Sequence, residues 1–159
     1  MPVPYKPATR TSPRSADGTV RSWLSVVRAY HLCDAVMTRR LGELGVKTPE
    51  HEILANLQRD PGLTQQALAQ RCFTAKSHIS GLLSSLEERG WVRREPDPSD
   101  ARAKRLFLQP AGERVAERTA VVQAEVVAAM AAAVSPAEMA QVTDAMGRVS
   151  EALQALLAP

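Results

Sequence analysis

Two short helical segments joined by a tight link, and followed at once by two extended runs, are the feature that most constrains this fold. Thr64 can cap the first segment, and Thr74 can cap a second that reaches about Arg89. Gly90 supplies the left-handed residue that commonly ends a helix. The sequence therefore predicts a helix-turn-helix between residues 64 and 90.

The runs after Gly90 predict a β-hairpin with a long tip. Trp91 and Val92 begin the first run and residues 105–108 form the second, around the polar, proline-containing loop 95–104. The hairpin and the short helices can form a small core of their own. Helix, tight turn, helix and hairpin together are the winged helix-turn-helix arrangement. In that arrangement the second helix enters the major groove of DNA, and the wing reaches the neighbouring backbone or minor groove.

The second short helix has one apolar and one polar side. Its apolar stripe predicts burial, and consists of Ile79, Leu82, Leu83 and Leu86. Its opposite side carries small and hydrogen-bonding residues, which are Lys76, Ser77, Ser80 and Ser84. Within a winged helix that polar side is the candidate DNA-reading surface, although a solvated helix face has the same composition.

A long helix is predicted before this region. From about Val20 to Leu44, apolar residues recur at steps of three and four, which indicates one long amphipathic helix that Gly45 ends. Thr48 and Pro49 then form an N-cap and first-turn pair for a shorter helix.

Two further helices are predicted at the C-terminal end. Pro110 occupies a first-turn position of a helix that reaches about Val134, and residues 135–138 form a capping box for the next one. Beyond that cap, apolar residues from Met139 to Leu156 alternate steps of three and four, the narrow seam of a helix packed on another helix. Such stripes and the many alanines suit close packing between subunits, which predicts a homodimer. An intrachain bundle would explain the same stripes.

Composition and charge narrow the class of protein. The chain has 159 residues, of which 45% are hydrophobic and 23% charged, as in one ordinary soluble domain. No run approaches the roughly 18 apolar residues of a membrane span, and no signal-peptide pattern opens the chain, so we expect a cytoplasmic protein without a membrane partner. Residues 1–58 and 59–105 each carry a net charge of +3, whereas residues 110–159 carry −3. This division suggests a face that meets a polyanion, although solvated faces of mixed charge would give the same balance.

Catalytic and metal-binding patterns are missing from the sequence. Cys33 and Cys72 are too few and too unpatterned for a disulfide scaffold or a structural zinc site. A glycine-rich phosphate loop, a nucleophile elbow and a clustered set of His, Cys and carboxylates are equally missing. We therefore expect no enzyme activity, no cofactor and no metal.

Several motifs resemble the MarR (multiple antibiotic resistance regulator) family. They are the stretch Leu68-Ala69-Gln70-Arg71, the run from Ile79 to Arg94 that reads ISGLLSSLEERGWVRR, and the wing residues Asp97, Asp100, Arg102 and Leu106 to Leu108. The resemblance covers most of residues 20–157 by element order and is densest at residues 63–112. It implies a mainly α-helical fold with a small β-hairpin wing, in which terminal helices form a dimerisation region.

The resemblance also implies that different parts of the chain form the dimer and bind DNA. Residues 20–47 and 110–157 would form the dimerisation region of a triangular, obligate dimer, and residues 48–109 the winged helix-turn-helix, within a single structural domain. Two winged domains would read a pseudo-palindromic operator in double-stranded DNA, and a small ligand would relieve repression. Residues 1–19 contain four prolines and no apolar periodicity, so we expect a flexible basic arm there.

Three positions depart from the family pattern. Ala75 stands where Thr or Ser is usual at the start of the recognition helix, and Gly81 where a basic residue is usual. Both departures bear on the pattern of base contacts. Gln109 replaces a Thr cap, which weakens a helix start by about 1 kcal/mol.

The candidate DNA contacts come from the polar side of the second helix and from the wing. Lys76 can donate to a phosphate or to guanine O6 and N7, and Arg102 resembles the wing-tip arginine that enters the minor groove. Asp100 would orient that guanidinium through a charge-assisted pair. The full set is Thr74, Lys76, Ser77, His78, Ser80, Ser84, Arg94, Asp100, Arg102 and Lys104. Arg93 and Arg105 are further phosphate candidates, although strand alternation should turn one of each adjacent pair away.

The first long helix carries the candidate effector site. His31 and Asp34 lie on adjacent helix surface, Arg28 could meet an anion, and Tyr30 could donate to a phenol or carboxylate. These residues predict a small aromatic or anionic effector, although Asp34 could equally form a salt bridge between subunits. Cys33 is a candidate redox sensor, but a buried cysteine that acts as a small apolar residue is commoner.

The sequence therefore predicts a dimeric, sequence-specific DNA-binding transcriptional regulator, most simply a repressor that a small ligand releases. The alternatives are a redox-responsive regulator acting through Cys33, an activator of the same fold, and a winged helix that binds another protein. The basic wing and recognition face favour DNA, because a protein-binding surface would tend to be apolar.

Overall fold

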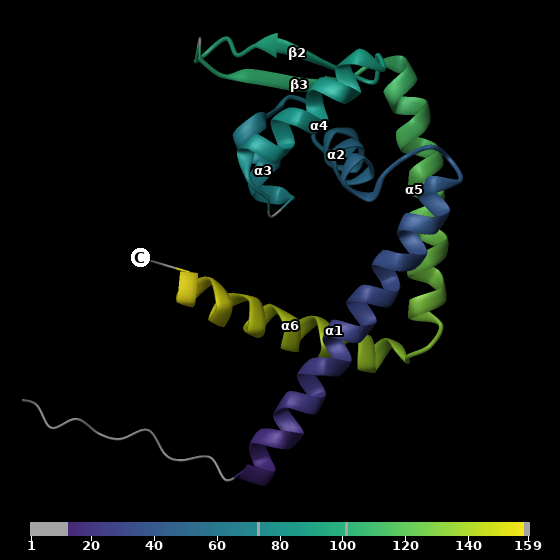
Figure 1. The fold of residues 1–159 in the computed structure, drawn as a ribbon, viewed down its shortest axis with the longest axis vertical. Coiled ribbons are helices and arrows are strands. Elements are labelled where there is room, and N and C mark those ends of the chain that lie inside the picture. The colour runs from purple at the N-terminus through teal and green to yellow at the C-terminus, as the bar shows by residue number, and fades with distance from the viewer. Residues whose placement is uncertain (1–12, 73, 101, 158–159) are drawn as a thin grey trace, which may run out of the picture. The chain divides into compact units, whose positions relative to one another are not determined.

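The computed structural model describes residues 13–72, 74–100 and 102–157, with side chains from residue 18 onward (Figure 1). In chain order the elements are α1 (Pro13–Gly42), α2 (Thr48–Arg59), β1 (Leu63–Thr64), α3 (Gln65–Arg71), α4 (Lys76–Glu88), β2 (Val92–Pro96), β3 (Lys104–Leu108), α5 (Pro110–Ala131) and α6 (Pro136–Leu157). The chain divides into two units, residues 1–36 and 37–159. This order confirms a mainly α-helical fold with a small β-hairpin wing.

The described part of the first unit is the long N-terminal portion of α1. This helix begins at Pro13, so residues 13–19 of the expected arm are helical and that expectation is wrong for them. A proline fits the first turn because its fixed φ suits a helix and its missing N–H is not needed there. Residues 1–12 of the arm lie outside the described residues. Among side chains 18–36 none is buried, and Trp23 is 51% exposed.

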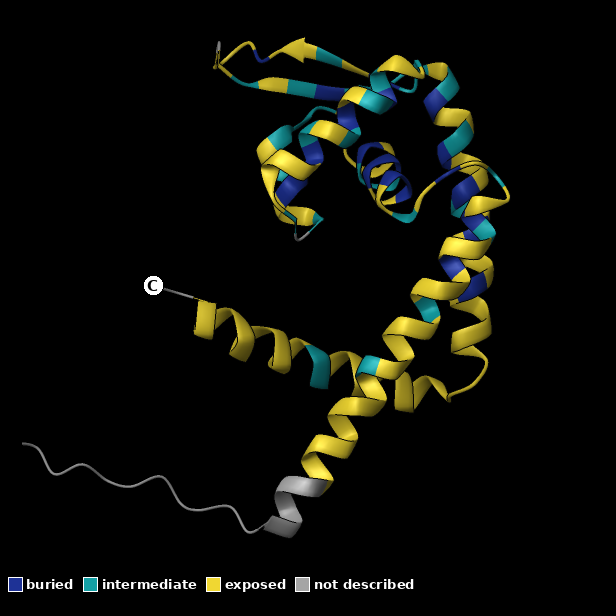
Figure 2. Cartoon of the chain, viewed as in Figure 1, coloured by how far each residue is buried: buried dark blue, intermediate teal, exposed yellow. Residues whose placement is uncertain are grey.

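The core of the second unit lies inside the winged helix. Its buried apolar residues come from α2, α3, α4, both hairpin strands and α5 (Figure 2). The predicted apolar stripe of α4 points into this core, with Ile79, Leu83 and Leu86 buried and Leu82 half-buried. Burial of that stripe leaves the polar side of α4 outward.

The wing is part of a small antiparallel sheet with strand order β1-β3-β2. The hairpin is confirmed, and its register runs from Val92 opposite Leu108 to Pro96 opposite Lys104. Residues 95, 96 and 104 continue the strands, so the tip is shorter than the expected loop 95–104. Strand β1 was not predicted, because two residues are too few to show an alternating pattern.

Two of the three predicted start and stop signals around α3 and α4 are confirmed. Thr64 caps α3 as predicted, since its hydroxyl accepts from the Ala67 N–H at 3.2 Å. Gly90 has φ 67°, the left-handed conformation expected at the end of α4. Thr74 is not the cap of α4; Ala75 takes that position without a side-chain hydrogen bond. Helix α4 therefore starts one residue later, with Lys76 in its first turn.

The caps of α2 and α6 show the same contrast. Thr48 does not cap α2, because Lys47 is the N-cap and its backbone N–H donates to Glu50 Oε2 at 2.9 Å. The predicted capping box of α6 is confirmed. The Glu138 N–H donates to Ser135 Oγ at 3.3 Å, and the Ser135 N–H donates back to Glu138 Oε2 at 2.8 Å. These bonds hold the pKa of Glu138 below its usual value.

The start of α5 is packed against the base of the wing. The Gln109 N–H donates to the Trp91 carbonyl at 2.8 Å, and the Gln109 side chain donates to the Val92 carbonyl at 3.1 Å. Gln109 makes no capping hydrogen bond, as its residue type predicted. Gly112 lies directly over the Trp91 backbone, where a Cβ would collide with the carbonyl group. This close approach explains why a glycine stands inside a helix.

The C-terminal helices leave much apolar surface uncovered. Helix α5 ends at Ala131 rather than near Val134, and the described residues of α6 include no buried side chain. The intrachain bundle is therefore wrong for α6. Among the described residues, no single helix is long and apolar enough to cross a membrane, and one sharply bent helix pair, α5 with α6, meets that test only by length and composition.

Candidate nucleic-acid interface

The outward side of α4 carries the predicted polar residues at its N-terminal end. Lys76, Ser77 and His78 are exposed in the first turn, and Thr74 is half-buried just before it. The Gln65 side chain donates to the Lys76 carbonyl at 3.4 Å and so ties α3 to the start of α4. The exposed first turn of α4 is therefore linked to α3.

Further along α4, two of the predicted contacts already have partners inside the protein. The Ser84 hydroxyl donates to the carbonyl of half-buried Ser80 at 3.1 Å. Arg94, on β2, places its Nε 3.0 Å from Glu87 Oε2 and its Nη2 3.5 Å from Ser84 Oγ. Arg94 thus fastens the wing to the recognition helix, a role that the sequence did not indicate.

The wing tip is organised by Asp97, to which the sequence assigned no role. Its carboxylate accepts from the Ser99 N–H at 2.7 Å, from the Ser99 hydroxyl at 2.5 Å and from Arg105 Nε at 2.7 Å. These bonds, that from the Ser99 hydroxyl foremost, hold the pKa of Asp97 well below its usual range. An Asp followed two residues later by Ser is the local signal that could have predicted this turn.

The expected pair between Asp100 and the Arg102 guanidinium is wrong. Asp100 Oδ1 instead accepts from the Arg102 backbone N–H at 2.9 Å. The Ala103 N–H donates to the Asp100 carbonyl at 2.9 Å, so the chain turns here and brings the backbone donor close to the carboxylate. Asp100 therefore shapes the tip, and the exposed Arg102 side chain is left outward.

Strand alternation sorts the wing arginines as expected. Arg93 lies on the opposite face of the sheet from Arg94, where it forms an ion pair with Glu95 and stacks over the Phe107 ring with its Cζ 4.8 Å from the ring centroid. Arg105, whose side chain forms an ion pair with Asp97, lies on the same face of the sheet as Arg93. Neither arginine lies with the exposed cations of the recognition surface, so both are poorer phosphate candidates than Lys104.

One cavity brings the strongest candidates together. A volume of about 380 Å³ lies between α3, the start of α4 and the wing, and its lining includes Lys76, Asp100, Arg102 and Lys104. Among the described residues, no ion pair neutralises these three cations. Lys76 precedes Arg102 by 26 residues and Lys104 by 28, yet the three side chains form one positive patch. Such a patch can hold an anionic group such as a phosphate.

Arg89, at the end of the recognition helix, makes contacts that the sequence did not indicate. Its Nη1 lies 3.3 Å from Oε2 of buried Glu50, and its Nη2 donates to the Gly45 carbonyl at 3.0 Å. The guanidinium also covers the Trp91 ring, 3.5 Å from the centroid. Arg89 therefore links the end of α4 to the start of α2.

The candidate effector residues all lie on the α1 portion of the first unit. Arg28, Tyr30, His31 and Asp34 are exposed there, and Cys33 is half-buried. The Tyr30 and His31 rings meet edge to face, with centroids 5.5 Å apart. In the described part of the chain, Arg28 and Asp34 form no ion pair. Helix α1 thus places these side chains on its surface.

Burial shifts the pKa of two residues in the second unit. His51, on α2, is 3% exposed, and burial lowers its pKa, so it is neutral at physiological pH. Cys72 lies 3.8 Å from the Asn56 side-chain amide, and burial raises the pKa of its thiol, as expected for an unreactive cysteine. Among the described residues, no three His, Cys, Asp or Glu side chains come together as a metal site would need.

The family model described as "MarR family" matches residues 44–103. The transcriptional regulator HosA of Escherichia coli O111:H- is 33% identical over 67 residues, which is 42% of this chain and 50% of HosA. The chain thus spans about half the length of the curated relatives it matches.

Solved structures resemble a larger share of the chain. Sco3205, a MarR family transcriptional regulator from Streptomyces coelicolor solved in complex with DNA, is 29% identical, with a TM-score of 0.77 over 83% of this chain and 88% of Sco3205. The PcaV transcriptional regulator from the same species, solved with its natural ligand, is 26% identical, with a TM-score of 0.68 over 92% of this chain and 99% of PcaV. The relatives named here are transcriptional regulators rather than enzymes. Residues 44–103 thus match the MarR family model, and the fold resembles that of solved MarR family regulators.

Proposed function

We propose that the chain is a sequence-specific DNA-binding transcriptional regulator, a homodimeric repressor that a small ligand releases. The observation that carries the proposal is the cavity where Lys76 of the recognition helix meets Arg102 and Lys104 of the wing. Three cations without an acidic partner among the described residues favour a backbone phosphate there. The DNA complex of Sco3205 supports the same use of the fold.

In the proposed complex, α4 enters the major groove of double-stranded DNA. Its exposed first turn would place Ser77 and His78 beside Lys76 against base edges or phosphates, with Thr74 and Ser80 at the margin. Arg102 would reach the minor groove, where narrow A·T-rich sequence attracts a guanidinium. Residues 48–109 would thus form the DNA-reading region.

The dimer is proposed from uncovered apolar side chains on α5 and α6. Val127 is 52% exposed, Val142 is 51% and Leu153 is 49%, which is more apolar surface than a monomer normally leaves in water. A second copy would cover it, with residues 20–47 and 110–157 as the dimerisation region. Two half-sites would then be about 34 Å apart, one turn of DNA.

Ligand response is the third part of the proposal. PcaV, solved with its natural ligand, is a structural neighbour of similar fold. In this chain an aromatic or anionic effector would meet Arg28, Tyr30, His31 and Asp34 on α1. Alanine variants of these residues should keep DNA affinity but lose release by the effector.

The test is fluorescence anisotropy of the purified protein on DNA that adjoins its own gene, with unrelated DNA as competitor. If Lys76, Arg102 and Lys104 each neutralise one phosphate in both subunits, log affinity should fall with log salt at a slope of roughly −5. Tight, competitor-resistant binding supports the proposal. Binding no better than to unrelated DNA argues against it, and would redirect the search to protein partners.

Arg102→Ala tests the wing tip. Loss of the contact in both half-sites should weaken binding by about 2 kcal/mol or more. The matched control is Arg118→Ala, which removes an exposed arginine from α5 outside the cavity and should leave affinity unchanged. Equal affinity of wild type and Arg102→Ala would remove this residue from the interface.

A further inference from the structure

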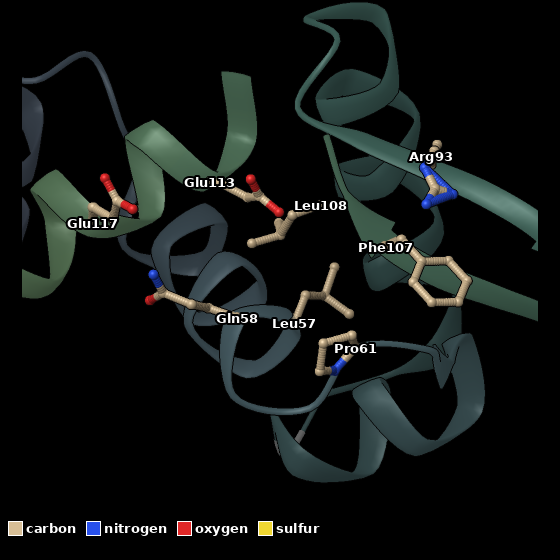
Figure 3. A pocket seen from close by; sticks show the side chains of 8 residues that line it. All are labelled: Leu57, Gln58, Pro61, Arg93, Phe107, Leu108, Glu113 and Glu117. Carbon is tan, nitrogen blue, oxygen red and sulfur yellow. The ribbon is translucent and has the colours of Figure 1, made fainter. Parts of the chain in front are cut away.

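A second cavity lies between α2, the hairpin strands and the start of α5 (Figure 3). Its volume is about 280 Å³, just below the roughly 300–1,000 Å³ of typical ligand pockets, so an occupant must be small. Leu57, which is 1% exposed, and half-buried Leu108 form its apolar base. An apolar base of this kind favours an occupant with a hydrocarbon or aromatic body.

An aromatic wall closes one side of the cavity. In Figure 3 the Phe107 ring and the Arg93 guanidinium lie opposite the Glu113 carboxylate, which is beside Leu108. Arg93 Cζ lies 4.8 Å from the Phe107 centroid, so this ring already contacts a planar cation. The face of an aromatic ring attracts a cation through its quadrupole.

The charge of the opposite rim is negative and unbalanced. Glu113 and Glu117 are exposed one helical turn apart on α5, and both line the cavity. Within the described residues neither carboxylate has an ion-pair partner, whereas Arg93 is neutralised by Glu95. Like charges four residues apart on a helix repel, and a bound cation would relieve that repulsion.

We propose that this cavity binds a small organic cation with an apolar body, such as an aromatic amine or amidine. The apolar part would rest on Leu57 and Leu108, and the positive group would meet Glu113 and Glu117. The site differs in place and in charge preference from the α1 effector site proposed above. It also does not depend on DNA binding, so the failure of either proposal leaves the other standing.

Benzamidine is the probe that tests the site, with neutral benzamide and anionic benzoate as matched controls of the same shape. In NMR titrations of the full chain, benzamidine should give saturable shifts at Phe107 and Leu108 that the two controls do not give. The double variant Glu113→Gln, Glu117→Gln should weaken benzamidine at least about tenfold, since each carboxylate contributes a charge-assisted contact.

Glu151→Gln removes the same charge from an exposed position of α6 outside the cavity, and should bind benzamidine as the wild type does. All substituted positions are exposed, and an unchanged spectrum away from the cavity verifies folding. The proposal is overturned if benzamide binds as well as benzamidine, if no shift saturates, or if the double variant keeps wild-type affinity.

Discussion

Gly112→Ala is the sharpest test of how α5 packs on the wing. A Cβ at this position would overlap the Trp91 carbonyl oxygen and lie 2.8 Å from the carbonyl carbon and 3.0 Å from Cα. Real Cβ atoms essentially never approach another heavy atom more closely than 3.0 Å. The carbonyl cannot step aside freely, because it accepts the Gln109 N–H at 2.8 Å. Backbone is therefore pressed against backbone, and α5 must move away from the sheet.

The expected cost follows from two opposing terms. Alanine is favoured over glycine inside a helix by about 1 kcal/mol. Overpacking a well-packed site costs about 1–3 kcal/mol and occasionally more, and a clash with backbone rather than a flexible side chain belongs at the upper end. We therefore expect Gly112→Ala to lower the free energy of unfolding by about 2 kcal/mol.

Urea unfolding followed by circular dichroism measures this change, at one fixed protein concentration because dimer stability depends on it. The matched control is Gly81→Ala, whose Cβ would have no neighbour within 4 Å and which should gain up to about 1 kcal/mol. A Gly112→Ala protein as stable as this control would refute the reasoning, since helix propensity alone would then explain both.

Three further variants probe the ion pairs and the buried histidine. Asp97→Asn should lower the urea midpoint at pH 7 and disorder the wing. Because the folded pKa of Asp97 is depressed, its contribution is present above the unfolded value of about 3.9 and is lost as pH falls below it, so the two midpoints should approach each other in acid. Burial lowers the pKa of His51, so as pH falls the unfolded state takes up a proton before the folded state does, and the melting temperature should fall at pH values below about 6.5. His51→Gln should flatten this dependence of melting temperature on pH. An unchanged dependence would contradict the role given to His51. Arg89→Met leaves buried Glu50 without its ion-pair partner and should lower the free energy of unfolding, measured by calorimetry, by roughly 1–2 kcal/mol. This is less than for a fully buried pair, because the Arg89 side chain is 35% exposed. No loss of stability would show that the pair adds nothing.

Local signals in the sequence predicted local structure where the interacting atoms are close along the chain. The cap at Thr64, the left-handed Gly90 and the capping box at residues 135–138 each depend on atoms only a few residues apart, and each was confirmed. The same reasoning failed at Thr74 and Thr48. The observed N-caps there, Ala75 and Lys47, are not preferred capping residues, so tertiary packing rather than residue type decides where these helices begin.

By itself, then, the sequence determined the order of the helices and the two hairpin strands, the apolar stripe of α4 and the basic character of the winged region, because periodicity and charge are properties of short stretches. Tertiary structure decided which cations act together. Arg94 forms an ion pair with Glu87 and Arg105 with Asp97, whereas Lys76 and Arg102 line one cavity. Those outcomes depend on strand register and on how the core orients the hairpin against α4, and contacts between distant residues leave no periodic trace in a single sequence.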